Sequence, residues 1–277
     1  MDEINDDNLY SLYNFFIQNE VKNEENFKSH KFEYGYYQLK EYIKELYFLS
    51  KIKREAYEKK IPIIEDEVGN ILRLICFLKK PKYVLEIGCG IGYSTYYIFS
   101  GIYLSINSTS LSNSDLQNFN LGISSNKKSK EMSNNFYYYG IDLNNKRLNQ
   151  AKDFINKQFS KLIDNNFINA NFIAGNAIKI INQNNFNCCF DLIFIDAAKF
   201  EYPIYLQAIK PILSNKSIII ADNIFYSGKI FKENISKHDY NSVQGIRQYI
   251  NLILNKDEFK TIFLNIKDGI SISLYKK

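Results

Sequence analysis

The sequence has few of the residues that build zinc centres or disulfide frameworks. Its 277 residues include two histidines and four cysteines, and no two cysteines form a C-x-x-C pair. This composition argues against a zinc site and against a disulfide framework. The four cysteines, which we expect to be free thiols, are Cys76, Cys89, Cys188 and Cys189.

The sequence also lacks long apolar runs and a strong net charge. No run reaches the roughly 18 apolar residues of a membrane helix, and the acidic start MDEINDDNLY has neither a signal-peptide core nor an Arg-rich transit pattern. We therefore expect a soluble, cytoplasmic protein with no membrane partner. The net charge of +5 permits an anionic partner without requiring one. The chain is long enough for one large core.

Two parts of the chain have weak patterning. Residues 105–135 are rich in Ser and Asn and show little apolar periodicity. We expect a disordered surface insertion there, because such a composition cannot bury enough surface to offset its ordering entropy. Residues 1–35 are expected to form a loose N-terminal arm, although residues 9–21 have helical spacing. Residues 36–277 are expected to form one domain.

A helical pattern covers residues 36–78, where apolar residues recur at intervals of three and four. Pro62 breaks this pattern, and Asp66 could cap the second helix. Lys51–Lys60 is the most basic segment of the chain. It is most simply interpreted as a solvated helix face, and the alternative is a contact for an anionic substrate such as RNA or a coenzyme A thioester.

A glycine-rich turn follows the first buried strand, residues 84–87. Gly88, Gly90 and Gly92 come at alternate positions, and a helix is expected to begin near Ser94 or Thr95. Glycines let the backbone turn tightly and approach a ligand closely, and a helix N-terminus offers free N–H groups to an anion. The G-x-G-x-G spacing differs from the G-x-G-x-x-G of dinucleotide binders. A purely structural turn is the alternative.

The next two predicted strands, residues 136–141 and 170–174, are also followed closely by polar residues. Asp142 follows the first of them. An acidic side chain at the end of the strand beside the glycine turn can accept hydrogen bonds from two ribose hydroxyls. Asn176 and Ala177 lie in the turn after the second strand, and a short polar turn there could border an adenine ring.

Two further strands, residues 191–195 and 217–221, are each followed by a carboxylate, Asp196 or Asp222. The residues between them have helical spacing over 202–213, so this is a β-α-β unit. Because the carboxyl ends of neighbouring parallel strands face the same crevice, we expect the two carboxylates to converge.

Two more polar residues accompany this carboxylate pair. Asn223 follows Asp222, and Lys199 lies three residues after Asp196. Two carboxylates and an amide oxygen are hard ligands suited to Mg²⁺ or another divalent cation such as Mn²⁺ or Ca²⁺. Taken singly, each residue could hold a turn or lie on the surface. Their occurrence together favours a site.

The C-terminal part of the sequence completes the expected fold. Residues 229–240 are expected to form a loop, residues 243–254 an amphipathic helix, and residues 259–265 and 270–275 a hairpin. We therefore predict an α/β fold with a Rossmann-like, seven-stranded, mostly parallel sheet. Helices cover both faces of this sheet, and the C-terminal hairpin is antiparallel.

The motifs together resemble the divalent-cation-dependent O-methyltransferases. This family includes catechol and caffeoyl-CoA O-methyltransferases and bacterial relatives, one of which methylates a hydroxyuridine at the tRNA wobble position. The resemblance covers roughly residues 61–277 and rests on V-L-E-I-G-C-G-I-G-Y-S, I-D-L, A-G-N-A, F-D-L-I-F-I-D-A-A-K, A-D-N-I-F-Y-S-G-K and D-G-I-S-I-S-L, in this order. It implies a class I methyltransferase domain with S-adenosylmethionine as cofactor. A homodimer is also expected from the resemblance, although members of the family differ in this respect.

The resemblance implies roles for individual residues. Lys199 matches the catalytic lysine, and Asp196, Asp222 and Asn223 match the metal ligands. Asp196 also counts among the catalytic residues. The residues expected at the cofactor are Glu86, Gly88, Gly90, Gly92, Tyr93, Ser94, Asp142, Asn176, Ala177 and Asp196.

The sequence departs from the family pattern at three places. Ile178 stands where an acidic residue is frequent, and Ser214-Asn215 replaces a common Gly-Gly turn. Tyr226-Ser227 replaces a frequent Trp-Arg in the loop that helps to shape the acceptor pocket. The first two changes concern local turns, whereas the third leaves the acceptor open.

Three functions are therefore considered. The first is methylation of a small catechol-like or related hydroxyl acceptor. The second is methylation of a tRNA wobble hydroxyuridine, which the basic segment favours. The third is a non-catalytic binding protein with the methyltransferase fold, against which the intact set of polar site residues argues.

Overall fold

The computed structural model describes residues 30–109, 135–183 and 186–277. The chain forms two compact units, residues 1–63 and 64–277. In the first unit, helix α2 (His30–Glu58) contains most of the basic segment, and the predicted domain boundary at residues 35 and 36 falls inside this helix. The helix expected over residues 9–21 lies outside the described residues.

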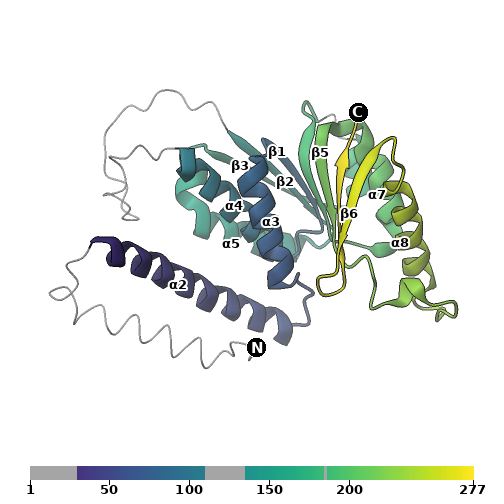
Figure 1. Cartoon of the computed structure of the whole chain (residues 1–277), viewed down its shortest axis with the longest axis horizontal. Coiled ribbons are helices and arrows are strands. Elements are labelled where there is room, and N and C mark those ends of the chain that lie inside the picture. The colour runs from purple at the N-terminus through teal and green to yellow at the C-terminus, as the bar shows by residue number, and fades with distance from the viewer. Residues whose placement is uncertain (1–29, 110–134, 184–185) are drawn as a thin grey trace. The chain divides into compact units, whose positions relative to one another are not determined.

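The second unit contains one seven-stranded sheet (Figure 1). The strands across this sheet are, in order, β3 (Ile168–Ala174), β2 (Phe136–Asp142), β1 (Tyr83–Ile87), β4 (Phe190–Ile195), β5 (Leu213–Ala221), β7 (Ile270–Tyr275) and β6 (Phe259–Leu264). The first five are parallel, while β7 is antiparallel to both β5 and β6. The predicted mostly parallel sheet with a C-terminal antiparallel hairpin is confirmed.

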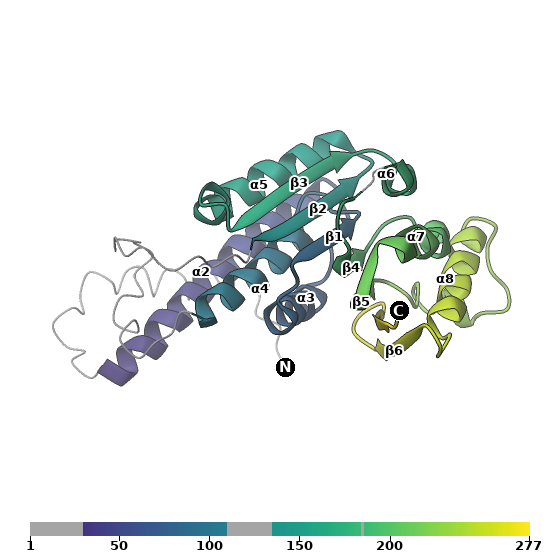
Figure 2. The ribbon, with the colours of Figure 1, turned by 90° about the horizontal axis from the view of Figure 1, so that it is seen from above.

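Helices cover both faces of the sheet (Figures 1 and 2). On one face lie α3 (Asp66–Lys79), α4 (Tyr93–Thr109) and α5 (Asn145–Asp164), and on the other lie α6 (Ala177–Gln183), α7 (Tyr202–Ile209) and α8 (Tyr240–Ile253). Short 3₁₀ turns occur at η1 (Lys199–Glu201), η2 (Lys210–Ile212) and η3 (Lys229–Phe231). Among the described residues, none of the helices combines the length and apolar character needed to cross a membrane.

The end of α4 and the start of α3 differ from the prediction. Helix α4 continues to Thr109, into the segment predicted to be a disordered insertion; the rest of that insertion, residues 110–134, lies outside the described residues. The helix accommodates Ser105 because its hydroxyl donates to the carbonyl of Ile102 at 2.8 Å. The prediction that Asp66 caps α3 is wrong: Glu65 is the N-cap residue and Asp66 begins the helix.

Strands β1 and β4 lie in the middle of the sheet, and most of their residues are apolar and buried. Their register fixes the position of the loops that follow. Ile87 of β1 pairs with Ile195 of β4, and Ile195 pairs with Ala221 of β5. The residues that follow these three strands therefore begin at the same edge of the sheet.

Candidate active site

The backbone ladder continues for one residue beyond the strand ends. The amide of Asp196 donates to the carbonyl of Ile87 at 3.0 Å, and the amide of Asp222 donates to the carbonyl of Ile195 at 3.1 Å. These bonds hold the first residue after β4 and after β5 against the neighbouring strand. The predicted convergence of the two carboxylate residues follows from this register.

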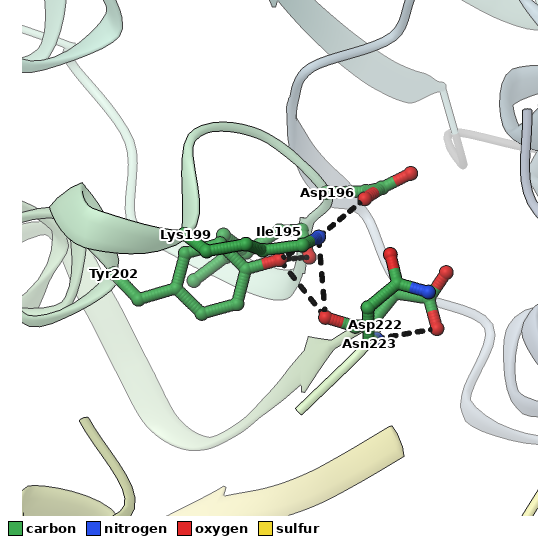
Figure 3. Close-up of polar contacts among 6 residues, drawn as sticks. All are labelled: Ile195, Asp196, Lys199, Tyr202, Asp222 and Asn223. Carbon is green, nitrogen blue, oxygen red and sulfur yellow. Dashed lines mark hydrogen bonds and ion pairs between the residues drawn. The ribbon is translucent and has the colours of Figure 1, made fainter. Parts of the chain in front are cut away.

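Lys199 connects the two strand ends (Figure 3). Its Nζ donates to Oδ1 of Asp196 at 2.8 Å and to the hydroxyl of Tyr202 at 2.6 Å, and it lies 3.4 Å from the carbonyl oxygen of Asp222. The lysine side chain is mostly buried, with 13% of its surface exposed. An amine held this way is aimed at the space beside the two carboxylates.

Asp222 is a buried carboxylate whose negative charge is only partly compensated. Its residue surface is 3% exposed. Burial, and after it the charge of Asp196, raise the pKa of Asp222 to about 7, while Lys199 and the amide of Asn223 act in the opposite direction. A bound cation would provide the compensation that the protein groups leave incomplete.

Asn223 adopts an uncommon backbone conformation beside this carboxylate. Its φ of +54° lies in the left-handed region, which Asn tolerates better than most residues. The backbone N–H of Asn223 donates to Oδ1 of Asp222 at 2.8 Å. Figure 3 shows the side chains of Asp196, Asp222 and Asn223 extending to the same side of Lys199.

This donor set fits a hard divalent cation. Two carboxylates and one amide oxygen are the ligand types that Mg²⁺ and Ca²⁺ take. Within residues 30–109, 135–183 and 186–277, no group of three or more His, Cys, Asp and Glu side chains could hold a metal ion. The predicted ligands are two carboxylates and the side-chain amide oxygen of Asn223, so they are not a group of three His, Cys, Asp or Glu residues.

The glycine turn lies against the end of β4. Gly88, Gly90 and Gly92 all have positive φ, at 94°, 53° and 87°. A Cβ atom added to Gly90 would meet nothing within 4 Å, so the backbone there faces open space. A ligand can approach this part of the turn directly, as a cofactor site requires.

Asp142 fixes the glycine turn to the end of β2. Its Oδ2 accepts the amide of Gly90 at 2.8 Å, and its Oδ1 accepts the amide of Asn144 at 2.7 Å. Each carboxylate oxygen has a second lone pair. The acid can therefore hold the turn and still accept a bond from a ribose hydroxyl.

Glu86 lies entirely inside the protein. Its carboxylate accepts hydrogen bonds from the hydroxyls of Ser94, Thr95 and Tyr138, with the Thr95 and Tyr138 bonds at 2.8 and 2.5 Å. Burial raises the pKa of Glu86, and these three bonds partly oppose that effect. With no exposed surface, Glu86 acts on the glycine turn by anchoring the first turn of α4.

Tyr93 and Ser94 also direct their side chains into the protein. The Tyr93 hydroxyl donates to Oδ1 of Asp66 at 2.6 Å, and that oxygen also accepts the Tyr97 hydroxyl at 3.1 Å. Desolvation by burial raises the pKa of Tyr93 well above its ordinary range. At this point of the turn, the groups that remain for a ligand are main-chain groups rather than these two hydroxyls.

The turn after β3 is short and capped. Oδ1 of Asn176 accepts the amide of Lys179 at 3.0 Å, and Ala177, which begins α6, is buried. This turn lies beside Asp142, which holds the glycine turn. Ala174 pairs with Asp142, and the amide of Gly175 donates to the carbonyl of Asp142 at 2.9 Å. This is where the sequence predicts an adenine ring.

The hairpin turn between β6 and β7 supports the segment that follows Asn223. The amide of Ile224 donates to the carbonyl of Gly269 at 3.0 Å, and the amide of Phe225 donates to the carbonyl of Asp268 at 2.9 Å. The backbone conformation of Asn223 is therefore braced by residues more than 40 positions later in the chain.

The loop after this segment, where the sequence departs from the family pattern, is held by Asp239. Its carboxylate pairs with Lys229 at 2.9 Å and accepts the Tyr226 hydroxyl at 3.3 Å and the Ser236 hydroxyl at 2.8 Å. Hydrogen bonding to Lys229 lowers the pKa of Asp239 and keeps this carboxylate charged. Tyr226 is thus part of a bonded loop rather than a free side chain.

Two tyrosines at the site were not predicted. Tyr202 contacts Lys199, and Tyr138 contacts Glu86. The first had a usable signal, because residues three apart at the start of a helix lie on the same face. The second had none, because β2 brings Tyr138 next to Glu86 only in the folded sheet.

Solved structures with this fold include several methyltransferases. The O-methyltransferase of Bacillus cereus, in complex with S-adenosylhomocysteine, is 21% identical over 82% of this chain and 90% of that chain, with a TM-score of 0.60. TomG of Streptomyces achromogenes, an O-methyltransferase involved in tomaymycin synthesis and solved with S-adenosylmethionine, is 17% identical over 83% and 89%, with a TM-score of 0.59. A candidate caffeoyl-CoA O-methyltransferase of Staphylococcus aureus is 22% identical over 85% and 98%, with a TM-score of 0.60. At these identities the likeness shows the fold.

The sequence itself shows the family. The O-methyltransferase family profile matches residues 121–276, which is more than half of the chain. The chain belongs to the O-methyltransferase family and is an enzyme of that class.

Proposed function

We propose that the protein transfers a methyl group from S-adenosylmethionine to a hydroxyl of a small, catechol-like acceptor, with a divalent cation such as Mg²⁺ at the site. The observation that carries this proposal is the contact of Lys199 with both strand ends that bear Asp196 and Asp222. A base, two carboxylates and an amide oxygen lie together there. Such a group suits the activation of a hydroxyl.

The cofactor is inferred from the glycine turn and from the neighbours. S-adenosylmethionine or S-adenosylhomocysteine is bound in the structures from Streptomyces achromogenes and Bacillus cereus. In this chain, the open backbone at Gly90 and the carboxylate of Asp142 are suited to the methionine and ribose portions of such a molecule. Asn176 and Ala177 would border its adenine.

Asp196, Asp222 and Asn223 would hold the cation, and a cation bound there would lower the pKa of an acceptor hydroxyl. Lys199, once its amine is in the neutral form, would take the hydroxyl proton at Nζ. Bound S-adenosylmethionine would supply the methyl group: the acceptor oxygen would bond to the methyl carbon while the bond from sulfur to that carbon breaks, and S-adenosylhomocysteine would remain. The protein mainly aligns the two reactants, which can lower a barrier by about 7–11 kcal/mol.

Methylation of a tRNA wobble hydroxyuridine is the second candidate. The observation in its favour is the basic segment Lys51–Lys60, most of which lies on α2. Positive charge of this kind binds phosphates without reading sequence. The chemistry at Lys199 would be the same with either acceptor.

The test is methyl transfer from labelled S-adenosylmethionine to a simple catechol, with Mg²⁺ and with a chelator, beside a parallel reaction on hypomodified tRNA. We expect cation-dependent methylation of the catechol. Methylation of the tRNA alone would favour the second candidate. Cofactor binding without transfer to either acceptor would contradict both candidate acceptors.

Asp222→Ala provides the matched variant for this assay. It removes one proposed cation ligand and leaves the glycine turn intact, so turnover should be lost while S-adenosylhomocysteine still binds in calorimetry. Cation-dependent methylation by this variant would refute the proposed role of Asp222.

A further inference from the structure

Tyr202 places a phenol hydroxyl at the junction of the two strand ends (Figure 3). The hydroxyl accepts a hydrogen bond from Nζ of Lys199 at 2.6 Å and lies 2.9 Å from the carbonyl oxygen of Asp222 and 3.3 Å from that of Ile195. One carbonyl belongs to the end of β5 and the other to the end of β4. A single atom therefore contacts the lysine and both strands.

The hydroxyl has one proton, and the shorter distance indicates that Asp222 receives it. Its oxygen accepts from Lys199 at the same time. Because Tyr202 has no exposed surface, its hydroxyl forms these bonds with protein groups and not with bulk water. Loss of this oxygen leaves Lys199 with Asp196 as its remaining close partner at 2.8 Å.

The ring of Tyr202 is fixed by its surroundings. It packs edge-to-face against Tyr249 of α8, with ring centroids 5.5 Å apart and an angle of 75°. The ammonium of Lys199 lies 4.9 Å from the centroid of the Tyr202 ring. Burial, followed by the charges of Asp196 and Asp222, raises the pKa of the phenol well above its ordinary range. The hydroxyl stays a neutral donor and acceptor.

We propose that Tyr202 is a positioning residue that holds the amine of Lys199 in a fixed place relative to the ends of β4 and β5. This inference rests on the proposed function, in which Lys199 receives the acceptor proton. A lysine side chain has four rotatable bonds and is costly to order. Two close partners, Asp196 and Tyr202, fix the direction of the lysine amine. A single partner would let the amine rotate.

Tyr202→Phe tests this role, and Tyr249→Phe is its matched control. Both substitutions remove one hydroxyl from a fully buried ring of the same core. The Tyr249 hydroxyl lies 3.5 Å from the hydroxyl of Ser271, so its removal does not change the partners of Lys199. The measurements are kcat, the KM for the acceptor, the Kd for S-adenosylhomocysteine, and Tm.

For Tyr202→Phe we expect kcat to fall at least tenfold, while KM and the Kd for S-adenosylhomocysteine change by less than about threefold. Tyr249→Phe should keep kcat within about twofold of the wild type. If Tyr202 were merely structural, both variants would lower Tm and neither would lower kcat. That result would overturn the inference.

A second readout does not depend on turnover. Acylation of Lys199 by an amine-reactive reagent, followed by peptide mass spectrometry, should be at least threefold faster in Tyr202→Phe than in the wild type or in Tyr249→Phe. An unchanged rate would overturn the inference. If the wild type transferred no methyl group, the proposed function would fail, while the acylation rates would still decide whether Tyr202 holds the lysine.

Discussion

A Cβ atom on Gly88 would lie 2.1 Å from the carbonyl oxygen of Asp196. The first glycine of the turn after β1 is therefore in backbone contact with the first residue after β4. The amide of Gly88 also donates to the carbonyl of Ile141 on β2 at 2.8 Å. The glycine turn therefore packs directly against the end of β4, which carries Asp196.

Gly88→Ala should disrupt both the glycine turn and the end of β4. The added methyl group meets main-chain atoms that cannot move aside, so we expect a loss of roughly 3–4 kcal/mol in the free energy of unfolding. Binding of S-adenosylhomocysteine should be lost as well. Gly90→Ala is the control, because Gly90 also has positive φ but no atom within 4 Å of an added Cβ. That variant should lose about 1–2 kcal/mol. Equal losses in urea unfolding would contradict the contact.

Asp222→Asn should change how stability depends on pH in the metal-free protein. The pKa of Asp222 is raised from 3.8 to about 7 in the folded protein. The folded protein therefore keeps a proton that the unfolded chain releases. The associated stability is fully present below pH 3.8 and is lost as pH rises through about 7. Asparagine does not titrate, so the variant avoids this loss.

We expect Asp222→Asn and the wild type to unfold at similar urea concentrations near pH 4. At pH 8 the variant should be the more stable by up to about 4 kcal/mol. Addition of Mg²⁺ at pH 8 should raise the Tm of the wild type and leave that of the variant nearly unchanged. A stability difference that is the same at both pH values would show that the Asp222 carboxylate does not titrate in this way.

Tyr138→Phe should destabilise the support of the glycine turn. The variant removes a bond of 2.5 Å to the buried carboxylate of Glu86, which costs roughly 1–3 kcal/mol. Because the hydroxyl favours the charged form of Glu86, its loss should cost more at pH 8 than at pH 5. Tyr137→Phe, at the neighbouring position of β2, is the control and should lose less than about 0.5 kcal/mol. A pH-independent loss would argue against a charged Glu86.

Gly245→Ala should displace the main chain of Lys199, because Gly245 of α8 packs directly against it. A Cβ atom on Gly245 of α8 would lie 2.5 Å from the Cα of Phe200 and 2.6 Å from the carbonyl oxygen of Lys199. Because both are main-chain atoms, η1 must shift, and we expect kcat to fall at least tenfold with a smaller effect on the binding of S-adenosylhomocysteine. Retention of full kcat would show that the lysine tolerates movement of its backbone.

The sequence predicts the strands that end at the site to within a few residues. The apolar run of β4 stops before Asp196, and the apolar run of β2 stops before Asp142, which is the last residue of that strand. The grouping of Lys199 with the two strand ends follows from the same reasoning, because register in a parallel sheet leaves little freedom for the residues that follow.

The start of β5 could not be found in this way. The strand begins at Leu213 rather than at the predicted Ser217, because Lys216, with φ of +63°, interrupts the pattern without ending the strand. The pairing of β4 with β5 shifts register in this region, as at a β-bulge. Ser214-Asn215 reads as a turn in the sequence and is strand in the structure.

Side-chain partners were the least predictable part of the site. Glu86 is a buried carboxyl group, and nothing near it in the sequence reveals that a tyrosine on another strand hydrogen-bonds to it. Tyr93 follows the glycine turn directly, yet its hydroxyl turns away to Asp66 on α3. Such choices depend on which helix covers which face, and that is decided by the packing of the whole domain.

The position of β7 between β5 and β6 has a consequence for biosynthesis. Residues 270–275 pair with β5 beside Asp222, with Ser271 opposite Ala221. On the ribosome, β5 emerges long before this neighbour exists and presents one unpaired edge in the meantime. A nascent chain paused in that interval offers an open strand edge to chaperones or to other chains. During synthesis, the side of β5 next to Asp222 therefore stays unpaired until residues 270–275 have been made.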